Sequence, residues 1–237
     1  MTRLDKYICD CGILTRSEAV RAVRSGRVTV NGNAVKDPSL KIDENSACVV
    51  LDSKTISWKR FRYIMLNKPN DTVSTTEDDP KSVMKLLPNE FSHMDMFPCG
   101  RLDIDTTGLL IITNDGQTAH NLLSPKKHCE KTYRFTCKPI TEKQKCQLEN
   151  GIELSDFTSK PCSVSLISGS CGEITVTEGK YHQIKRMFLA VGSEILTLER
   201  IMFAGIRLDD SLNPGEWREL TEEEENMLLG YNINEGN

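Results

Sequence analysis

Hydrophobic and polar positions follow two periods along this chain, and each period predicts its own kind of element. Helical spacing and capping signals predict helices over residues 17–26, 118–123, 141–150, 184–191 and 221–229, with a short one over 81–87. Alternating or continuous apolar runs predict strands over residues 28–30, 33–35, 48–51, 61–67, 109–112, 130–136, 151–154, 163–167, 173–177, 195–203 and 206–208. The pattern indicates a small module of helices and a hairpin, followed by a sheet-rich domain.

The first sixty residues carry the clearest local signals. Thr15 and Glu18 have the spacing of a capping box, which predicts the start of a helix, and Gly26 marks its end. Asn31-Gly32 between two short apolar runs is the signature of a two-residue hairpin turn. Four arginines accompany the helix: Arg16, Arg21, Arg24 and Arg27. They suit contacts to phosphate groups, but they also suit the solvated face of an amphipathic helix.

The stretch Gly100-Arg101-Leu102-Asp103-Ile104-Asp105-Thr106-Thr107-Gly108 places two acids before a glycine turn and the apolar run Leu109–Ile112. This order predicts an acid-bearing loop at the start of a buried strand. If the loop is extended, the side chains of Asp103 and Asp105 point to opposite faces, and only one of them can face a given cleft. An Asp that merely caps the turn explains the pattern equally well.

Charge is distributed unevenly along the 237 residues, a length that suffices for one or two domains with a sizeable core. The net charge of −4 does not by itself indicate a nucleic-acid partner. Residues 1–60, however, hold 11 Lys or Arg against 7 Asp or Glu, whereas residues 61–237 hold 19 against 27. We interpret the Glu222–Glu225 run as a solvated helix start or tail.

Nine cysteines are scattered along the chain without Cys-x-x-Cys spacing and without a secretory leader. This arrangement favours reduced thiols in the cytosol over a disulfide framework or a zinc site. No uninterrupted apolar run exceeds five residues, which is far too short to span a membrane. We therefore expect a cytoplasmic protein with no metal site and no membrane association.

Four segments resemble the pseudouridine synthases, enzymes that re-attach an RNA uracil to its ribose through carbon. The Gly100–Gly108 loop is similar to the signature loop of that family, and its wording is most similar to the branch that acts on small-subunit ribosomal RNA. Met65-Leu66-Asn67-Lys68-Pro69 resembles the first short motif, which mainly supports the fold near the active site. Lys131-Thr132-Tyr133 resembles the tyrosine-bearing strand, and His182-Gln183-Ile184-Lys185 the basic segment.

The resemblance implies a role for each of these residues. The essential carboxylate of the family falls on Asp103, the tyrosine that stacks on the target base on Tyr133, and the basic partner of the carboxylate on Lys185. Arg101 is then the candidate to fill the space that an extruded base leaves, and His182 is a supporting residue. A cation about 4 Å from a carboxylate contributes on the order of 4 kcal/mol at an effective dielectric of about 20, which is enough to keep the acid ionised.

The beginning of the chain resembles the S4 domain, a small RNA-binding module. Leu4-Asp5-Lys6-Tyr7, the helix over 17–26 and the Gly26–Gly32 segment carry this resemblance, which implies that the four arginines contact RNA. We expect an α+β protein: a helix–helix–hairpin S4 domain over residues 1–52, a linker over 53–60, a mainly antiparallel catalytic domain over 61–230, and a tail over 231–237.

Together the resemblances imply isomerisation of a specific uridine to pseudouridine in small-subunit (16S) ribosomal RNA, with Asp103 as nucleophile or base on a flipped-out uridine. The bond from ribose C1′ to N1 is exchanged for one to C5 with no change in composition, so we expect no cofactor. The RNA is either naked or part of a partly assembled small subunit, and a monomer is the default.

Three alternatives remain at this stage. A synthase that acts on large-subunit (23S) RNA belongs to the same family, and a non-catalytic RNA-binding ribosome-assembly factor would share its fold. The presence of all three expected site residues, Asp103, Tyr133 and Lys185, favours the enzyme over the factor. A glycoside hydrolase is the weakest reading, because it needs two carboxylates that face one substrate.

Overall fold

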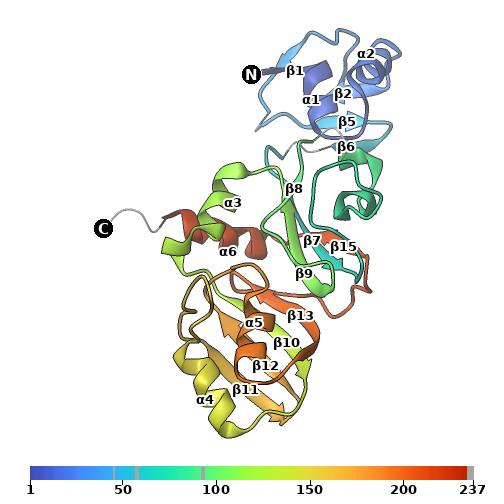
Figure 1. Ribbon diagram of the computed structural model, residues 1–237. Helices are drawn as coiled ribbons and strands as arrows, with labels where there is room; N and C mark the ends of the chain where they lie inside the picture. The colour runs from blue at the N-terminus through green and yellow to red at the C-terminus, as the bar shows by residue number, and fades with distance from the viewer. Residues whose placement is uncertain (45, 57–58, 92–93, 234–237) are drawn as a thin grey trace. The chain divides into compact units, whose positions relative to one another are not determined.

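The computed structural model describes residues 1–44, 46–56, 59–91 and 94–233, and the chain divides into two compact units (Figure 1). The first unit comprises Met1–Arg62 and Pro88–Met96, and the second comprises Tyr63–Leu87 and Phe97–Asn237. Within the described residues, no helix has both the length and the apolar character that crossing a membrane requires.

The first unit places two helices and a small sheet around one core, as the sequence predicts. Its helices are α1 (Leu4–Asp10) and α2 (Arg16–Arg24). Its four-stranded sheet has the order β3 (Asn33–Ala34), β2 (Val28–Val30), β5 (Val49–Leu51), β6 (Lys54–Ile56), and β1 (Thr2–Arg3) pairs separately with β4 (Lys41–Ile42). The core joins Leu4, Tyr7 and Ile8 of α1 to Ala19, Ala22 and Val23 of α2 and to the inner face of the sheet.

Local signals in this unit are realised at the predicted positions. The Thr15 hydroxyl accepts the backbone N–H of Glu18, and the Glu18 carboxylate accepts the backbone N–H of Thr15, which completes the capping box. Asn31 and Gly32 both adopt positive φ, at 50° and 80°, as a tight hairpin turn requires. Strand β6 falls in the segment that we expected to be a linker, and residues 57–58 of that segment lie outside the described residues.

The second unit is built on one large sheet with helices attached to it (Figure 1). The sheet has the order β11 (Ser163–Ser168), β12 (Cys171–Val176), β10 (Lys131–Cys137), β13 (Ile195–Phe203), β9 (Thr106–Thr113), β7 (Tyr63–Lys68), β15 (Trp217–Glu219), with β14 (Ile206–Arg207) on β13 and β8 (Phe97–Pro98) on β9. Every pairing is antiparallel except that of β9 with β13. The expected α+β class with a mainly antiparallel sheet is thus confirmed.

The helices of this unit follow the predicted ranges closely. They are α3 (Gly116–Leu123), α4 (Glu142–Asn150), α5 (Gln183–Ala190) and α6 (Glu222–Ile233), with a 3₁₀ turn at Val83–Leu86. Helix α5 packs on the sheet through Phe188, whose ring meets that of Phe135 in β10 edge-to-face at 4.9 Å. Helix α6 lies beside α3 (Figure 1).

Three sequence expectations differ from the structure. All six residues of β7 are buried, because the strand lies between β9 and β15, whereas the alternating pattern of residues 61–67 is typical of a half-buried strand. Strand β15 carries only three residues, too few for a periodic signal, and was not predicted. Residues 151–154, predicted as a strand, form a single bridge between Glu153 and Thr158.

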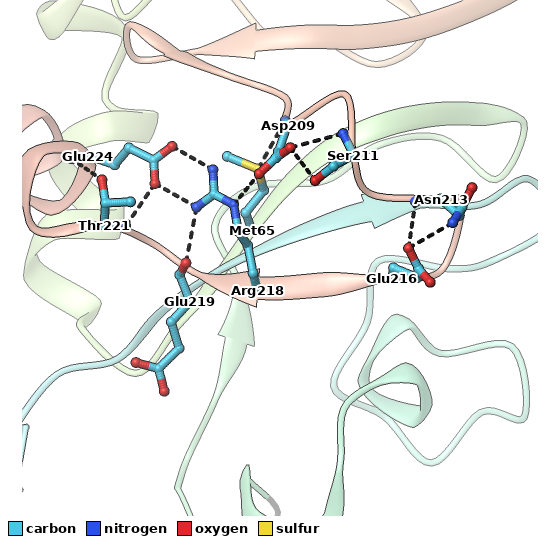
Figure 2. A network of polar contacts seen from close by, with 9 residues as sticks. All are labelled: Met65, Asp209, Ser211, Asn213, Glu216, Arg218, Glu219, Thr221 and Glu224. Atoms are coloured by element: carbon cyan, nitrogen blue, oxygen red, sulfur yellow. Dashed lines mark hydrogen bonds and ion pairs between the residues drawn. The ribbon is translucent and has the colours of Figure 1, made fainter.

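Figure 2 shows the polar network that joins β15 to α6. Arg218 donates to both carboxylate oxygens of Glu224 at 2.7 and 2.8 Å and to Asp209 at 2.6 Å. Hydrogen bonds from Ser211 and from this guanidinium lower the pKa of Asp209 to about 2. Glu224 also accepts the backbone N–H of Thr221, which begins the helix. Our interpretation of the acidic run as solvated is therefore wrong for Glu224, whose side chain is 17% exposed.

Candidate active site

The parallel pairing of β9 with β13 brings the acid-bearing loop next to β10. Thr106 at the start of β9 lies opposite Leu198 of β13, whose other neighbour is β10. Gly108 has a φ of +93°, and a Cβ atom there would lie 2.4 Å from the carbonyl oxygen of Arg200. Only glycine permits so close an approach of the two strands.

Lys185 holds both acids of the loop. Its ammonium nitrogen lies 3.2 Å from Oδ2 of Asp103 and also donates to Oδ1 of Asp105. The Nε2 atom of His182 lies 3.6 Å from the other oxygen of Asp103. The hydrogen bond from Lys185 lowers the pKa of Asp105, so its carboxylate is ionised at neutral pH. One cation thus joins the loop to the first turn of α5.

We expected Asp103 and Asp105 to point to opposite faces if the loop is extended, and that condition is not met. Residues 104 and 105 form a turn, in which Thr106 donates its backbone N–H to the carbonyl of Asp103. The turn directs both carboxylates to the same ammonium group. They differ in environment, since the side chain of Asp103 is 28% exposed and that of Asp105 is 61% exposed.

Lys68 anchors the loop from within the sheet. It is fully buried at the end of β7, and its ammonium group donates to three backbone carbonyls, those of Thr106 at 2.8 Å, Pro69 at 3.2 Å and Ile104 at 3.3 Å. Burial lowers the pKa of Lys68 to about 8, a shift that the nearby carboxylates of Asp105 and Asp103 only partly oppose. Its contacts explain why a short motif distant in sequence belongs to the site.

A cleft of about 70 Å³ opens at this loop, and we call it the Asp103 cleft. Residues that line it include Arg101, Asp103, Thr106, Tyr133, His182 and Lys185. Tyr133 comes from β10 and is only 9% exposed, because its ring lies on the buried face of the sheet. The structure therefore brings together the four residues that the sequence singled out in this domain: Arg101, Asp103, Tyr133 and Lys185.

The turn before α5 is fixed by Gln183 and Glu178, two residues to which the sequence analysis gave no role. The side chain of Gln183 donates to Glu178 at 3.1 Å and accepts the backbone N–H of Lys180 at 3.1 Å. His182 has a φ of 48°, and the Tyr181 ring stacks on its imidazole at 3.8 Å. Gln183 is 5% exposed, and a buried amide needs hydrogen-bond partners. The sequence signal for this role was an amide side chain at the start of an amphipathic helix.

The four arginines that accompany α2, namely Arg16, Arg21, Arg24 and Arg27, fall into two pairs. All four are exposed, but Arg27 is ion-paired with Asp52, and Arg16 lies 4.0 Å from Asp5. Arg21 and Arg24 make no ion pair in the described parts of the chain, and both side chains leave the polar face of α2. Arg21 and Arg24 are therefore the two guanidinium groups here that have no carboxylate partner to exchange for a phosphate.

The described residues contain no cluster of three or more His, Cys, Asp or Glu side chains that could hold a metal ion. The nine cysteines are all free thiols. The residues that line the Asp103 cleft carry carboxylate, ammonium, imidazole, guanidinium and phenol groups.

Comparison with known proteins agrees with this geometry. Residues 62–190 match the family of RNA pseudouridylate synthases, and residues 2–47 match the S4 domain. The ribosomal small subunit pseudouridine synthase A of Vibrio cholerae is 43% identical over 225 residues, 94% of this chain and 97% of that protein. The Escherichia coli protein of the same name is 40% identical, with 94% and 97% covered.

Two further relatives cover almost the whole chain. An uncharacterised RNA pseudouridine synthase of Bacillus subtilis is 40% identical, with 95% of this chain and 98% of that protein covered. A crystal structure of a pseudouridylate synthase superposes with a TM-score of 0.68 at 37% identity and covers 96% of this chain and 100% of that one.

Proposed function

The chain belongs to the RNA pseudouridylate synthase family and carries an S4 domain, and from this premise we propose that it isomerises a specific uridine of small-subunit (16S) ribosomal RNA to pseudouridine. Membership makes the protein an isomerase. The relatives from Vibrio cholerae and Escherichia coli, which are named for the small ribosomal subunit, favour that RNA over the large-subunit RNA.

One observation carries the catalytic part of the proposal: the ion pair of Asp103 with Lys185 in a cleft that Tyr133 also lines. Pseudouridine formation needs an ionised carboxylate in a site from which water is largely excluded. The ammonium group of Lys185, 3.2 Å away, stabilises a negative charge on this carboxylate. The same ionised group serves attack at C1′, addition to the base or removal of a sugar proton.

The remaining residues of the cleft bind and hold the uridine. The phenol ring of Tyr133 offers a flat surface on which the extruded base stacks, and stacking leaves the edge of the base free to react. Arg101 lies beside the acid at the cleft wall, where its guanidinium group can occupy the space left in the RNA stack. Loss of stacking costs a few kcal/mol, which contacts to the base and the phosphates recover.

The S4 domain supplies affinity for the RNA that the cleft alone lacks. Exposed arginines on one helix face contact phosphates and position the RNA without reading its sequence. Arg21 and Arg24 are the first candidates, because Arg16 and Arg27 already contact carboxylates.

Tritium release from C5-labelled 16S and 23S rRNA tests the proposal, because C5 loses its hydrogen when it bonds to C1′. We expect wild-type protein to release tritium from 16S rRNA only, and Asp103→Asn to bind that RNA without release. Release from 23S rRNA alone would show that the substrate is large-subunit RNA. No release from either RNA, or from partly assembled small subunits that it binds tightly, would favour the assembly factor.

A further inference from the structure

Tyr133 borders a second cavity in addition to the Asp103 cleft. This cavity measures about 370 Å³, and residues on its wall include Arg101, Lys131, Tyr133, Glu178, Lys180 and Arg200. Four of the six are cations, so we call it the cationic pocket. Arg101, Tyr133, Glu178 and Lys180 also line the Asp103 cleft, which makes the two cavities neighbours.

The strand register places the two inner cations beside Tyr133. Arg200 of β13 is the direct cross-strand partner of Tyr133 in β10, and Lys131 precedes Tyr133 by two residues on the same buried face. Both cations lie near the ring of Phe203, at 5.6 Å for the Lys131 nitrogen and 4.7 Å for the Arg200 guanidinium carbon. A ring face stabilises a cation but does not neutralise its charge.

Among the described residues, neither inner cation has an anionic partner. Lys131 is 7% exposed and donates to the carbonyl of Cys129, and Arg200 is 2% exposed and donates through Nε to the carbonyl of Leu109. The buried Nη2 atom of Arg200 has no hydrogen-bond partner at all within the described residues. No carboxylate in that part of the chain forms an ion pair with either group.

The carboxylate of Glu178 does not supply the missing charge. Its Oε2 atom accepts the backbone N–H of Lys160 at 2.9 Å and the Gln183 side chain at 3.1 Å, and it makes no ion pair with the cations of the pocket. Glu178 therefore shapes the wall of the cavity, and the cations outnumber it four to one.

Two unpaired cations side by side in a buried setting are costly, because desolvation and mutual repulsion both disfavour their charged forms. Burial, with a smaller effect from Arg200, lowers the pKa of Lys131 accordingly. A fold keeps such a pair where a ligand supplies the opposite charge. Arg101 and Lys180 are exposed and add positive charge at the mouth of the cavity.

We propose that the cationic pocket binds a phosphate group of the RNA strand, next to the nucleotide whose base reaches Tyr133. A guanidinium fork and ammonium groups are the donors that phosphate oxygens prefer. Every nucleotide of the strand carries one phosphate. Because the two cavities share a wall, a phosphate in the cationic pocket would lie beside the base in the Asp103 cleft. The choice of RNA over a free anion rests on the proposed function.

The test compares Lys131→Met, which removes the charge but keeps the length of the side chain, with Lys143→Met, a loss of the same charge from an exposed position on α4. Binding of a 16S rRNA transcript is measured against salt concentration. We expect Lys131→Met to reduce the slope of log K against log salt by about 0.7–0.9 relative to Lys143→Met. Lys180→Ala, an exposed substitution that folding tolerates, is expected to lower the slope as well.

Two further measurements distinguish an RNA phosphate from a free phosphate as the ligand, and the pocket proposal from the proposed function. Melting is followed in sodium phosphate and in sodium chloride at equal ionic strength, and tritium release is followed with wild-type protein. Unchanged salt slopes in both Lys131→Met and Lys180→Ala overturn the pocket, whether or not the wild type is active. Stabilisation by inorganic phosphate that Lys131→Met abolishes, with unchanged RNA slopes, would make this a site for a free anion and overturn the RNA assignment. Altered slopes without any tritium release would support the pocket and count against the proposed reaction alone.

Discussion

The ammonium group of Lys185 lies 3.2 Å from Asp103 and is shared with Asp105, so the two acids of one loop are held by a single cation on α5. The two acids have different roles in our proposal. Only Asp103 has its carboxylate on the Asp103 cleft, whereas Asp105 does not line that cavity. On this difference we base the proposal that Asp103 reacts and that Asp105 positions Lys185.

We expect Lys185→Met to slow a single turnover about 100-fold or more, the usual loss when one preorganised electrostatic partner of a reacting group is removed. Lys185→Arg keeps the charge and is expected to lose less than about tenfold. Asp105→Asn leaves the pair of Lys185 with Asp103 in place, so its loss should also stay within about tenfold. Tritium release under single-turnover conditions measures all three, with Lys143→Met as the control. A loss in Asp105→Asn as large as that in Asp103→Asn would contradict the assignment of the reacting acid.

The lowered pKa of Lys68 leads to a prediction about the pH dependence of turnover, since a pKa of about 8 lies near neutral pH. Above that pH the group loses a proton and one donor to the three carbonyls that fix the loop, so we expect turnover to fall as pH rises through 8. Asp71, Asp103, Asp105 and Lys185 also act on it, which is why the comparison needs a variant. Lys68→Met, slower at every pH, is expected to lack this alkaline decline.

Stability should change in the opposite direction over the same window. The folded pKa of Lys68 is lowered, so between about pH 8 and 10.4 the unfolded chain binds more protons than the folded one. The free energy of unfolding of wild type minus that of Lys68→Met therefore rises with pH over that window. Urea unfolding of both proteins between pH 7 and 10 measures this difference. A difference that stays flat would show that folding does not lower the pKa of Lys68.

The arginines of α2 provide a comparison within one helix. Arg21→Ala with Arg24→Ala removes two exposed cations that form no ion pair within the described residues, and we expect the salt slope of RNA binding to fall by about 1.4–1.8. Arg16→Ala with Arg27→Ala removes cations that already contact Asp5 and Asp52, so a smaller change is expected. Filter binding to 16S rRNA between 50 and 400 mM salt distinguishes the pairs. Equal reductions of the salt slope would show that Arg16 and Arg27 leave Asp5 and Asp52 and contact the RNA.

The sequence predicted elements reliably where a local signal existed. The capping box at Thr15, the Asn31-Gly32 turn and the stripe of α5 each depend on residues close together in the chain, and each was found in place. The resemblance to the synthases predicted Arg101, Asp103, Tyr133 and Lys185 as site residues, and all four line the Asp103 cleft. The roles of those residues remain predictions for the experiments above.

What the sequence missed depends on contacts between distant segments. The ammonium group of Lys68 reaches a loop 36 residues away, and Arg200 becomes the neighbour of Tyr133 only through the register of β10 with β13. The contact of Asp105 with Lys185 could not be predicted, because periodicity assumes a regular backbone, which a turn does not have. No periodic pattern carries any of these relationships.

The bond between Arg218 and Glu224 yields a final prediction, which concerns stability (Figure 2). The guanidinium group lowers the pKa of Glu224, so the stabilisation is complete above its ordinary pKa and is lost as pH falls below about 4.3. At pH 7 we expect Glu224→Gln to reduce the free energy of unfolding by about 1–2 kcal/mol, in the range for a charge-assisted bond at a partly exposed site.

Glu223→Gln is the matched control, because Glu223 is exposed in the same turn of α6 and makes no ion pair in the described residues. Urea unfolding from pH 7 to pH 3 should show the two variants converging at low pH, where Glu224 of the parent is protonated. Equal stability of the two variants at pH 7 would mean that the bidentate contact contributes nothing net, as happens when the entropy of fixing two long side chains offsets their attraction. The apolar packing of helix α6, to which the fully buried Leu228 contributes, would then outweigh this contact.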